Sequence, residues 1–149
     1  MIDGVEITPL RKIPDERGYV MQMLRADSPA FRGIGEVYFS AVYPSVVKGW
    51  HRHLTNTLSY TAIKGMVKVV LYDERPKSPT HGELLELFVG DQDYKLVTVP
   101  PGVWNGFKGM SAPEAIVAVC MTNPYDPAEI ERLDPFANQI PYKWDLKHG

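Results

Sequence analysis

The sequence predicts an all-β protein, a sandwich or barrel that takes up residues 1–149 as one domain and carries one short helix. Three observations support this prediction. Short runs rich in Val, Ile, Leu, Tyr and Phe recur along the chain, turn residues separate them, and helical periodicity is scarce. The 12 glycines and 13 prolines suit many short strands joined by turns. With 149 residues, the chain is long enough to bury a core without disulfides.

Eight segments have the length and composition of strands. They comprise residues 5–10, 19–24, 36–43, 58–63, 66–72, 84–89, 94–99 and 115–121. Turn-forming clusters lie between them, at residues 15–18, 64–65, 76–79, 90–91 and 100–102. In the segment 66–72, Lys68 interrupts the apolar run, as expected for a strand with one face toward water.

The one helix is expected over residues 126–133. Asp126 is placed to cap this helix, and Pro127 suits its first turn. Glu129 can reach back to the start of the helix in a capping-box arrangement.

Charge and hydropathy exclude several classes of function. The 16 Lys and Arg residues against 18 Asp and Glu leave a net charge of −2, so there is no basic surface for nucleic acid. The longest apolar run, residues 115–121, is too short to span a membrane, and the first residues lack the pattern of a signal peptide. Cys120, the only cysteine, is expected to be a buried small hydrophobic residue in that run. We therefore expect a cytoplasmic protein.

The segment around residues 48–53 is the most informative for chemistry. On a strand, His51 and His53 point to the same side while Arg52 points to the other. Gly49 would let a backbone or a ligand come close. Two imidazoles beside Lys48 can supply a base and a cation to one cavity. The alternative is that one histidine is a satisfied core residue and the other faces solvent.

A metal site is the rival interpretation of the same histidines. His51 and His53 match the pair of the metal-binding cupin pattern, but residues 56–58 contain no carboxylate. Asn105 stands where the third histidine of that pattern should be. Two imidazoles alone are a poor site for zinc, iron or manganese, so we expect no metal.

Five further motifs occur in order along the chain. They are DERG at residues 15–18, VKGWH at 47–51, YDER at 72–75, SPTHG at 78–82 and VPPGVWNGF at 99–107. Together they resemble the motifs of the dTDP-4-dehydrorhamnose 3,5-epimerases. The resemblance covers roughly residues 10 to 130. It implies a cupin jelly roll, usually a homodimer. It also implies activity without metal or cofactor on a 4-keto-6-deoxyhexose joined to a nucleoside diphosphate.

The chemistry of that family requires a base, a group that stabilises the enolate oxygen, and a proton donor on the opposite face. The resemblance places His51 at the position of the base. Lys48 falls where the family has an arginine near the substrate, and it can still place a positive charge beside an enolate or a phosphate. Arg17 falls on the arginine that contacts the diphosphate.

The sequence departs from the family at the proton donor and at the partner of the base. Val119 occupies the position of the donor tyrosine, so Tyr125 or Tyr60 must substitute if a donor is present. The resemblance places the carboxylate partner of the base in a C-terminal segment that we expect this shorter chain to lack, and Asp145 is the candidate to replace it.

The remaining substrate contacts are expected from polar and aromatic residues near the pocket, namely His53, Tyr60, Trp104 and Asn105. The sequence leaves three functions open. The first is an epimerase acting at C3, C5 or both of a nucleoside-diphosphate-4-keto-6-deoxy sugar. The second is a 3,4-ketoisomerase, because residues 48–53 also resemble the RG-x-H-A-H segment of those enzymes. The third is a non-catalytic sugar-nucleotide-binding cupin.

Overall fold

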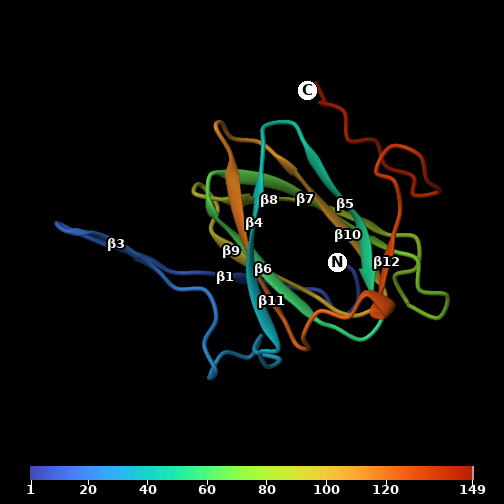
Figure 1. The fold of residues 1–149 in the computed structure, drawn as a ribbon, viewed down its shortest axis with the longest axis horizontal. Helices are drawn as coiled ribbons and strands as arrows, with labels where there is room; N and C mark the ends of the chain where they lie inside the picture. The colour runs from blue at the N-terminus through green and yellow to red at the C-terminus, as the bar shows by residue number, and fades with distance from the viewer. Residues whose placement is uncertain (149) are drawn as a thin grey trace.

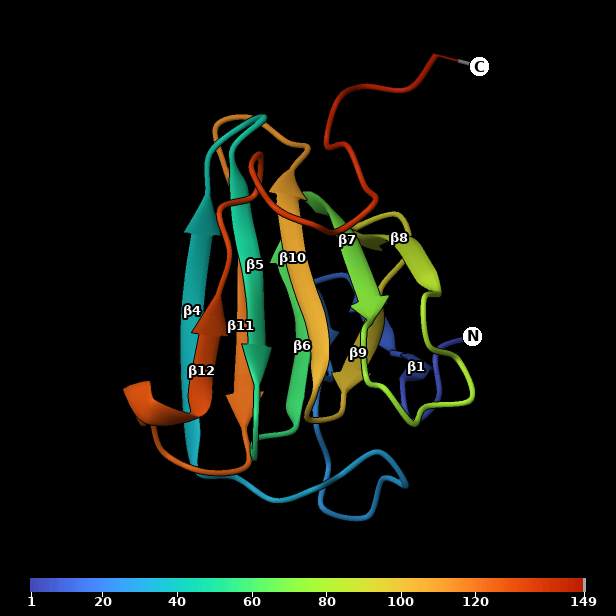
Figure 2. The ribbon, with the colours of Figure 1, turned by 90° about the vertical axis from the view of Figure 1, so that its right-hand side faces the viewer.

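The computed structural model describes residues 1–148 and consists of two antiparallel five-stranded sheets packed face to face, with a separate hairpin (Figures 1 and 2). The first sheet has the order β1 (Glu6–Pro9), β9 (Lys95–Val99), β6 (Leu58–Lys64), β11 (Ala115–Met121) and β4 (Glu36–Val42). The second has the order β12 (Ile130–Arg132), β5 (Val47–His53), β10 (Val103–Gly109), β7 (Met66–Asp73) and β8 (Leu84–Gly90). Strands β2 (Lys12–Asp15) and β3 (Gly18–Met21) form the hairpin.

The predicted all-β class is confirmed, and each of the eight expected strands is present within three residues of its expected bounds. Strands β2, β10 and β12 add to them, and the histidine segment lies on β5 as assumed. No helix within residues 1–148 is long and apolar enough to cross a membrane.

The one predicted helix forms in the expected place but is shorter than the expected residues 126–133. Only a single 3-10 turn forms, at Pro127–Glu129, and the chain continues as β12, which pairs with β5. The predicted cap is present, because the Asp126 side chain accepts a hydrogen bond from the backbone N–H of Ala128. Glu129, however, does not reach back to the cap. Its carboxylate instead accepts hydrogen bonds from the backbone N–H groups of Leu54 and Thr55 in the loop after β5. This tertiary contact outweighs the local preference of the segment for a helix.

The main core fills the space between the sheets. Alternation along each strand places one row of apolar side chains inward, as expected for a sandwich. The inward residues include Leu58, Tyr60 and Ala62 of β6, Val67, Val69 and Leu71 of β7, and Val117, Val119 and Met121 of β11. Cys120 is buried, as predicted.

A second, smaller core lies on the outer face of the second sheet, where the C-terminal segment crosses it (Figure 2). Trp144 from that segment packs on Trp50 of β5, with ring centroids 5.1 Å apart. Its backbone carbonyl accepts a hydrogen bond of 2.8 Å from the Nζ of Lys108 on β10. The C-terminal residues therefore pack on the outer face of β5, the strand that carries His51, and stabilise its position.

The YDER and SPTHG motifs form a polar cluster after β7. Asp73 is fully buried, and its carboxylate accepts hydrogen bonds from the Arg75 guanidinium at 2.8 Å and the Ser78 and Thr80 hydroxyls at 2.6 and 2.7 Å. Burial alone would raise the pKa of Asp73, but these donors lower it well below its usual range. The motif thus fixes the β7–β8 connection.

We predict that Asp73→Asn destabilises the protein by about 2 to 4 kcal/mol, because it removes the charge that the buried donors require. The measurement is the free energy of unfolding from urea denaturation. Asp27 makes the matched control, since Arg25 donates to it with the same two-bond geometry at the surface. Asp27→Asn should leave stability unchanged. Equal effects of the two substitutions would contradict this account of the motif.

Candidate active site

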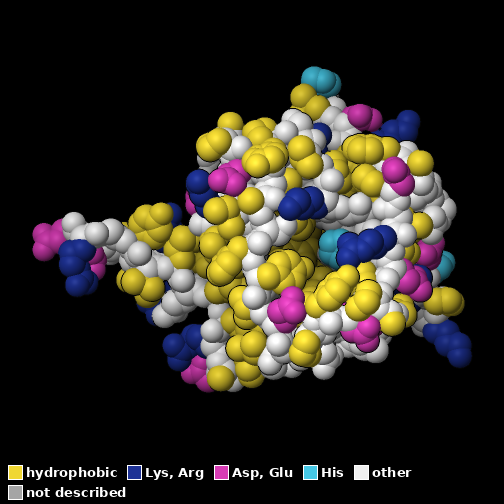
Figure 3. All heavy atoms as spheres, viewed as in Figure 1, with side chains coloured by type: hydrophobic (Ala, Val, Ile, Leu, Met, Phe, Trp, Pro, Cys, Tyr) yellow, Lys and Arg dark blue, Asp and Glu magenta, His cyan; other side chains and the backbone are white. Residues whose placement is uncertain are grey.

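A cavity of about 590 Å³ opens between the two sheets near β4 and β12. Figure 3 shows a hollow with mostly hydrophobic walls and with histidine and basic side chains at its rim. The first sheet contributes Tyr38, Ser40, Leu58, Tyr60 and Val119 to the lining. The second contributes Lys48, His51, Phe107 and Arg132, and residues 133–135 complete it.

An irregularity in the pairing of β5 with β10 turns two of the predicted residues into this cavity. Asn105 pairs with His51, and the next inward residue of β10, Phe107, pairs with Lys48. Lys48 and His51 are three residues apart, so strict alternation would place them on opposite faces. The register shift between Asn105 and Phe107 lets both face inward.

Gly49 is the residue that makes this irregularity possible. A Cβ at that position would lie 2.9 Å from the Cα of Gly106 on β10, which is closer than two such atoms can approach. The close backbone approach predicted for Gly49 is therefore confirmed, and here the approaching group is a neighbouring strand.

Lys48 bridges the two sheets at the cavity. Its Nζ donates a hydrogen bond of 2.9 Å to the Oγ of Ser40 on β4. The ammonium group is thereby held over the cavity and remains accessible to a ligand.

His51 is partly buried, and its surroundings keep its ring neutral. Burial lowers the pKa of His51 to about 4, and the nearby His53 and Arg132 act in the same direction, while the Asn105 side chain opposes them. The Asn105 amide also donates to the backbone carbonyl of His51 at 3.1 Å, which fixes this part of β5. At neutral pH the imidazole can therefore accept a proton.

His53 is buried and its Nδ1 contacts the carboxylate of Glu129. Burial alone would raise the pKa of Glu129, but hydrogen bonds from Asn56, His53 and the loop backbone lower it to about 2. His51 and His53 line one face, as predicted, with ring centroids 5.9 Å apart. Among the residues described, no three His, Cys, Asp or Glu side chains are arranged to hold a metal ion.

A smaller cavity of about 290 Å³ adjoins the first, and the two share Tyr38, His51 and Arg132. His53 and Tyr125 line only the smaller one. Tyr125 is 56% exposed, so its ring is open to a ligand at the surface.

Three other predicted residues are absent from the lining of both cavities. Asn105 is buried and contacts His51 rather than the cavity. Trp104 is on the outer face of β10, where its Nε1 donates to Glu74 at 2.8 Å and its ring stacks 4.5 Å from the Arg52 guanidinium. Asp145 lies in the C-terminal segment and lines a separate hollow formed by residues of that segment. None of the three contributes to the lining around His51.

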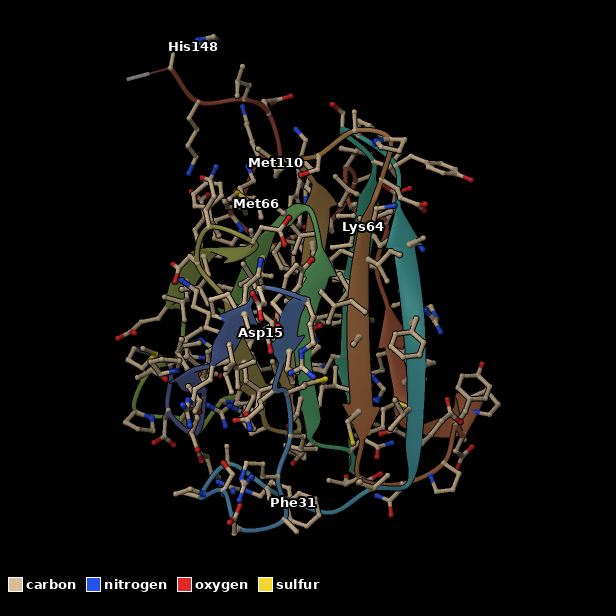
Figure 4. The ribbon with its side chains drawn as sticks, turned by 90° about the vertical axis from the view of Figure 1, so that its left-hand side faces the viewer. Asp15, Phe31, Lys64, Met66, Met110 and His148 are labelled. Atoms are coloured by element: carbon tan, nitrogen blue, oxygen red, sulfur yellow. The ribbon has the colours of Figure 1, made fainter. Side chains whose placement is uncertain are left out.

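Arg17 lies in the turn of the β2–β3 hairpin, which projects from the body of the molecule (Figure 1). It is 86% exposed in its side chain and pairs with Asp15 at 2.7 Å. Figure 4 views the molecule from the hairpin side, with Asp15 labelled, and shows His148 in the C-terminal tail beyond the barrel. Arg17 does not line the cavity of its own chain.

Sequence reasoning missed Arg132, Tyr38 and Ser40, which all line the cavity. Arg132 was hidden because it lies in the segment interpreted as a helix, whereas it ends β12 beside His51. Tyr38 and Ser40 lie on a strand that was correctly predicted, but their inward orientation becomes visible only when β4 is paired with β11.

Comparison with known proteins agrees with this geometry. The sequence profile of the dTDP-4-dehydrorhamnose 3,5-epimerases matches residues 1–148. A Haloferax volcanii protein described as a probable low-salt glycan biosynthesis epimerase, Agl13, is 34% identical over 143 residues, which are 95% of this chain and 88% of that protein. The Bacillus subtilis spore coat polysaccharide biosynthesis protein SpsL is 31% identical over 97% of this chain and 91% of its own.

A solved structure shares both fold and sequence. The crystal structure of a dTDP sugar isomerase from Desulfovibrio desulfuricans G20 matches with a TM-score of 0.91 and 43% identity, covering 96% of this chain and 92% of that one. The resemblance inferred from five motifs thus extends over nearly the whole sequence and confirms the cupin-like fold. The chain belongs to the dTDP-4-dehydrorhamnose 3,5-epimerase family, a family of isomerases.

Proposed function

We propose that this protein epimerises C3, C5 or both of a nucleoside-diphosphate-4-keto-6-deoxy sugar. The observation that carries the proposal is the neutral imidazole of His51 on the inner wall of the cavity, beside the Lys48 ammonium. The names of the relatives, an epimerase of glycan biosynthesis and a dTDP sugar isomerase, support the same substrate class.

The mechanism begins with proton abstraction by His51. A ketone at C4 acidifies the neighbouring C–H bonds, and a positioned base accelerates their cleavage by roughly 10²- to 10⁴-fold. The enolate oxygen that develops is stabilised by a cation, for which Lys48 and Arg132 are both placed at the cavity. Return of a proton to the other face of the carbon inverts it.

The cavity suits the size of this substrate. Its volume of about 590 Å³ lies within the usual range for small-ligand sites, roughly 300 to 1,000 Å³. The sugar occupies this cavity, with Tyr60 in its wall. Asn105 acts through His51, whose backbone carbonyl accepts its hydrogen bond. The exposed Tyr125 ring and His53 then serve the part of the ligand in the adjoining cavity. Trp104 and Asp145 have no part in this proposal because they line other surfaces.

We also propose that residues 1–149 act as one cupin-like domain in a homodimer. The projecting hairpin exposes Tyr19 and Val20, and the outward side of the edge strand β4 exposes Val37 and Phe39. A second copy would cover these apolar side chains. In a dimer, the hairpin would also bring Arg17 to the diphosphate in the partner's cavity.

We propose a cytoplasmic location as well, where the single cysteine, Cys120, would stay reduced.

His51→Asn should lower deuterium exchange at C3 and C5 of dTDP-4-keto-6-deoxyglucose by at least about 100-fold in heavy water, because the base is lost. Proton NMR of the sugar measures the exchange. His148→Asn, in the C-terminal tail, is the matched control and should exchange at the wild-type rate. Wild-type exchange in His51→Asn would refute the role of this base.

The same experiment separates the alternative functions. A 3-keto product seen by carbon NMR would identify a ketoisomerase. Saturable binding of the sugar nucleotide without exchange would identify a binding protein.

The pH dependence follows from the lowered pKa of His51. Since the neutral form is the base, kcat/KM should stay level from about pH 8 to about pH 5 and fall with a midpoint at about 4. An ordinary histidine would give a midpoint at about 6.5. The measurement is the initial rate of exchange across this range, with circular dichroism to establish that the fold persists. A midpoint between about 6 and 7 would contradict the neutral, desolvated base.

The homodimer predicts a specific effect of charge on the hairpin. Val20→Asp should shift the sedimentation coefficient from that of two chains to that of one, because the side chain would be buried against the partner. Leu146→Asp, at a similarly exposed apolar position in the C-terminal segment, should leave the dimer intact. A wild-type protein that sediments as a monomer would overturn this part of the proposal.

A further inference from the structure

Three side chains form a row across the first sheet on its cavity side. Val119 of β11 pairs with Tyr38 of β4 on one side and with Tyr60 of β6 on the other. Residues in register on adjacent strands point to the same face, and all three line the cavity. The valine at the position where the family resemblance implies a tyrosine therefore has a tyrosine on each side.

Tyr60 points from the first sheet toward the second. Its ring lies 6.5 Å from that of Phe107 on β10, and only 2% of the residue is exposed. Its hydroxyl is buried, and no residue in the described part of the chain offers it a hydrogen bond. Buried hydroxyls normally have partners, so this one is an unused donor on a ring that lines the cavity.

The two sheets give a bound sugar ring two different neighbours. His51 approaches from the second sheet and Tyr60 from the first, and both line the cavity of about 590 Å³, which has room for a sugar ring. Inversion requires removal of a proton from one face of the carbon and delivery to the other. We propose that Tyr60 is the acid that protonates the enolate on the face opposite His51. This inference rests on the proposed epimerase function.

Each proton moved in this step comes from, and returns to, a named group. His51 takes the proton from C3 or C5, and the electron pair of that C–H bond forms the enolate. The Tyr60 hydroxyl then gives its proton to the same carbon from the other side and becomes a tyrosinate. After product leaves, the His51 imidazolium returns a proton to Tyr60 through water, which restores both groups. Burial raises the pKa of Tyr60 above its usual range, so the phenol is protonated at the start of each cycle.

The other tyrosines at the site fit this role less well. Tyr125 lines only the smaller cavity and is 56% exposed. Tyr38 is 38% exposed and lies at the wall shared by both cavities, on the side of the rim. Of the three, Tyr60 alone combines an inward position, full burial and an unpaired hydroxyl among the residues that the structure describes.

The test separates proton removal from proton delivery. In heavy water, Tyr60→Phe should still wash deuterium into recovered dTDP-4-keto-6-deoxyglucose, because His51 can remove a proton and return a deuteron on the same face. Formation of the epimer should fall by at least about 100-fold. His51→Asn should lose both signals. Tyr94→Phe is the matched control, since Tyr94 is also buried with an unpaired hydroxyl but lies outside the cavity, and it should behave as wild type.

Several results would overturn the inference. Epimer formation by Tyr60→Phe within a few-fold of wild type would show that another group donates the proton. If Tyr38→Phe still incorporated deuterium into the substrate but formed no epimer, the proton donor would be Tyr38 instead. Loss of both signals in a folded Tyr60→Phe protein would make Tyr60 a binding residue. A wild-type protein with neither wash-in nor epimer would instead overturn the proposed function, and Tyr60 would lose its role with it.

Discussion

The candidate site depends on one local constraint, the register shift where β5 pairs with β10. It turns His51 and Lys48 to the same side of a strand on which alternation would separate them. Gly49 allows the shift because a side chain there would meet the backbone of β10. The outward residue of the same segment, Trp50, is packed under Trp144. Groups on both faces of the sheet thus hold the imidazole in place.

The sandwich architecture provides what a two-sided reaction needs. A jelly roll encloses its ligand between two sheets, so each sheet can present a different group to one face of a flat, enolised carbon. His51 and Lys48 come from one sheet, and the tyrosine row comes from the other. Burial among the cavity walls removes water from the imidazole and keeps it neutral. Burial therefore shapes both the binding and the chemistry of the cavity.

Much of the fold could be predicted from local patterns, because strand composition and turn residues are short-range signals. The segment after Asp126 shows the limit of such signals. Its capping residues favour a helix locally, whereas Glu129 is bound by the loop after β5 and the chain continues as β12. For that reason Arg132 was not predicted as a site residue. Its position beside His51 depends on the pairing of β12 with β5, which no local sequence pattern reveals.

The site was predictable where a motif and strand alternation agree. His51, His53 and the opposite orientation of Arg52 follow from a period of two, and Asn105 faces inward opposite His51. Trp104 is adjacent to Asn105 in a motif, yet it points outward because neighbours on a strand face opposite ways. Asp145 lies in a C-terminal segment whose path is set by tertiary contacts, and Arg17 lies in a hairpin that projects from the body of the molecule; spacing along the chain shows neither.

The most direct test of the central claim is a crystal structure with a dTDP-linked 4-keto sugar or a close analogue bound. We predict a ring nitrogen of His51 at roughly 3 to 3.5 Å from C3 or C5, with the Tyr60 hydroxyl on the other face of the sugar. A sugar bound elsewhere, or a His51 ring turned away from it toward bulk water, would contradict it.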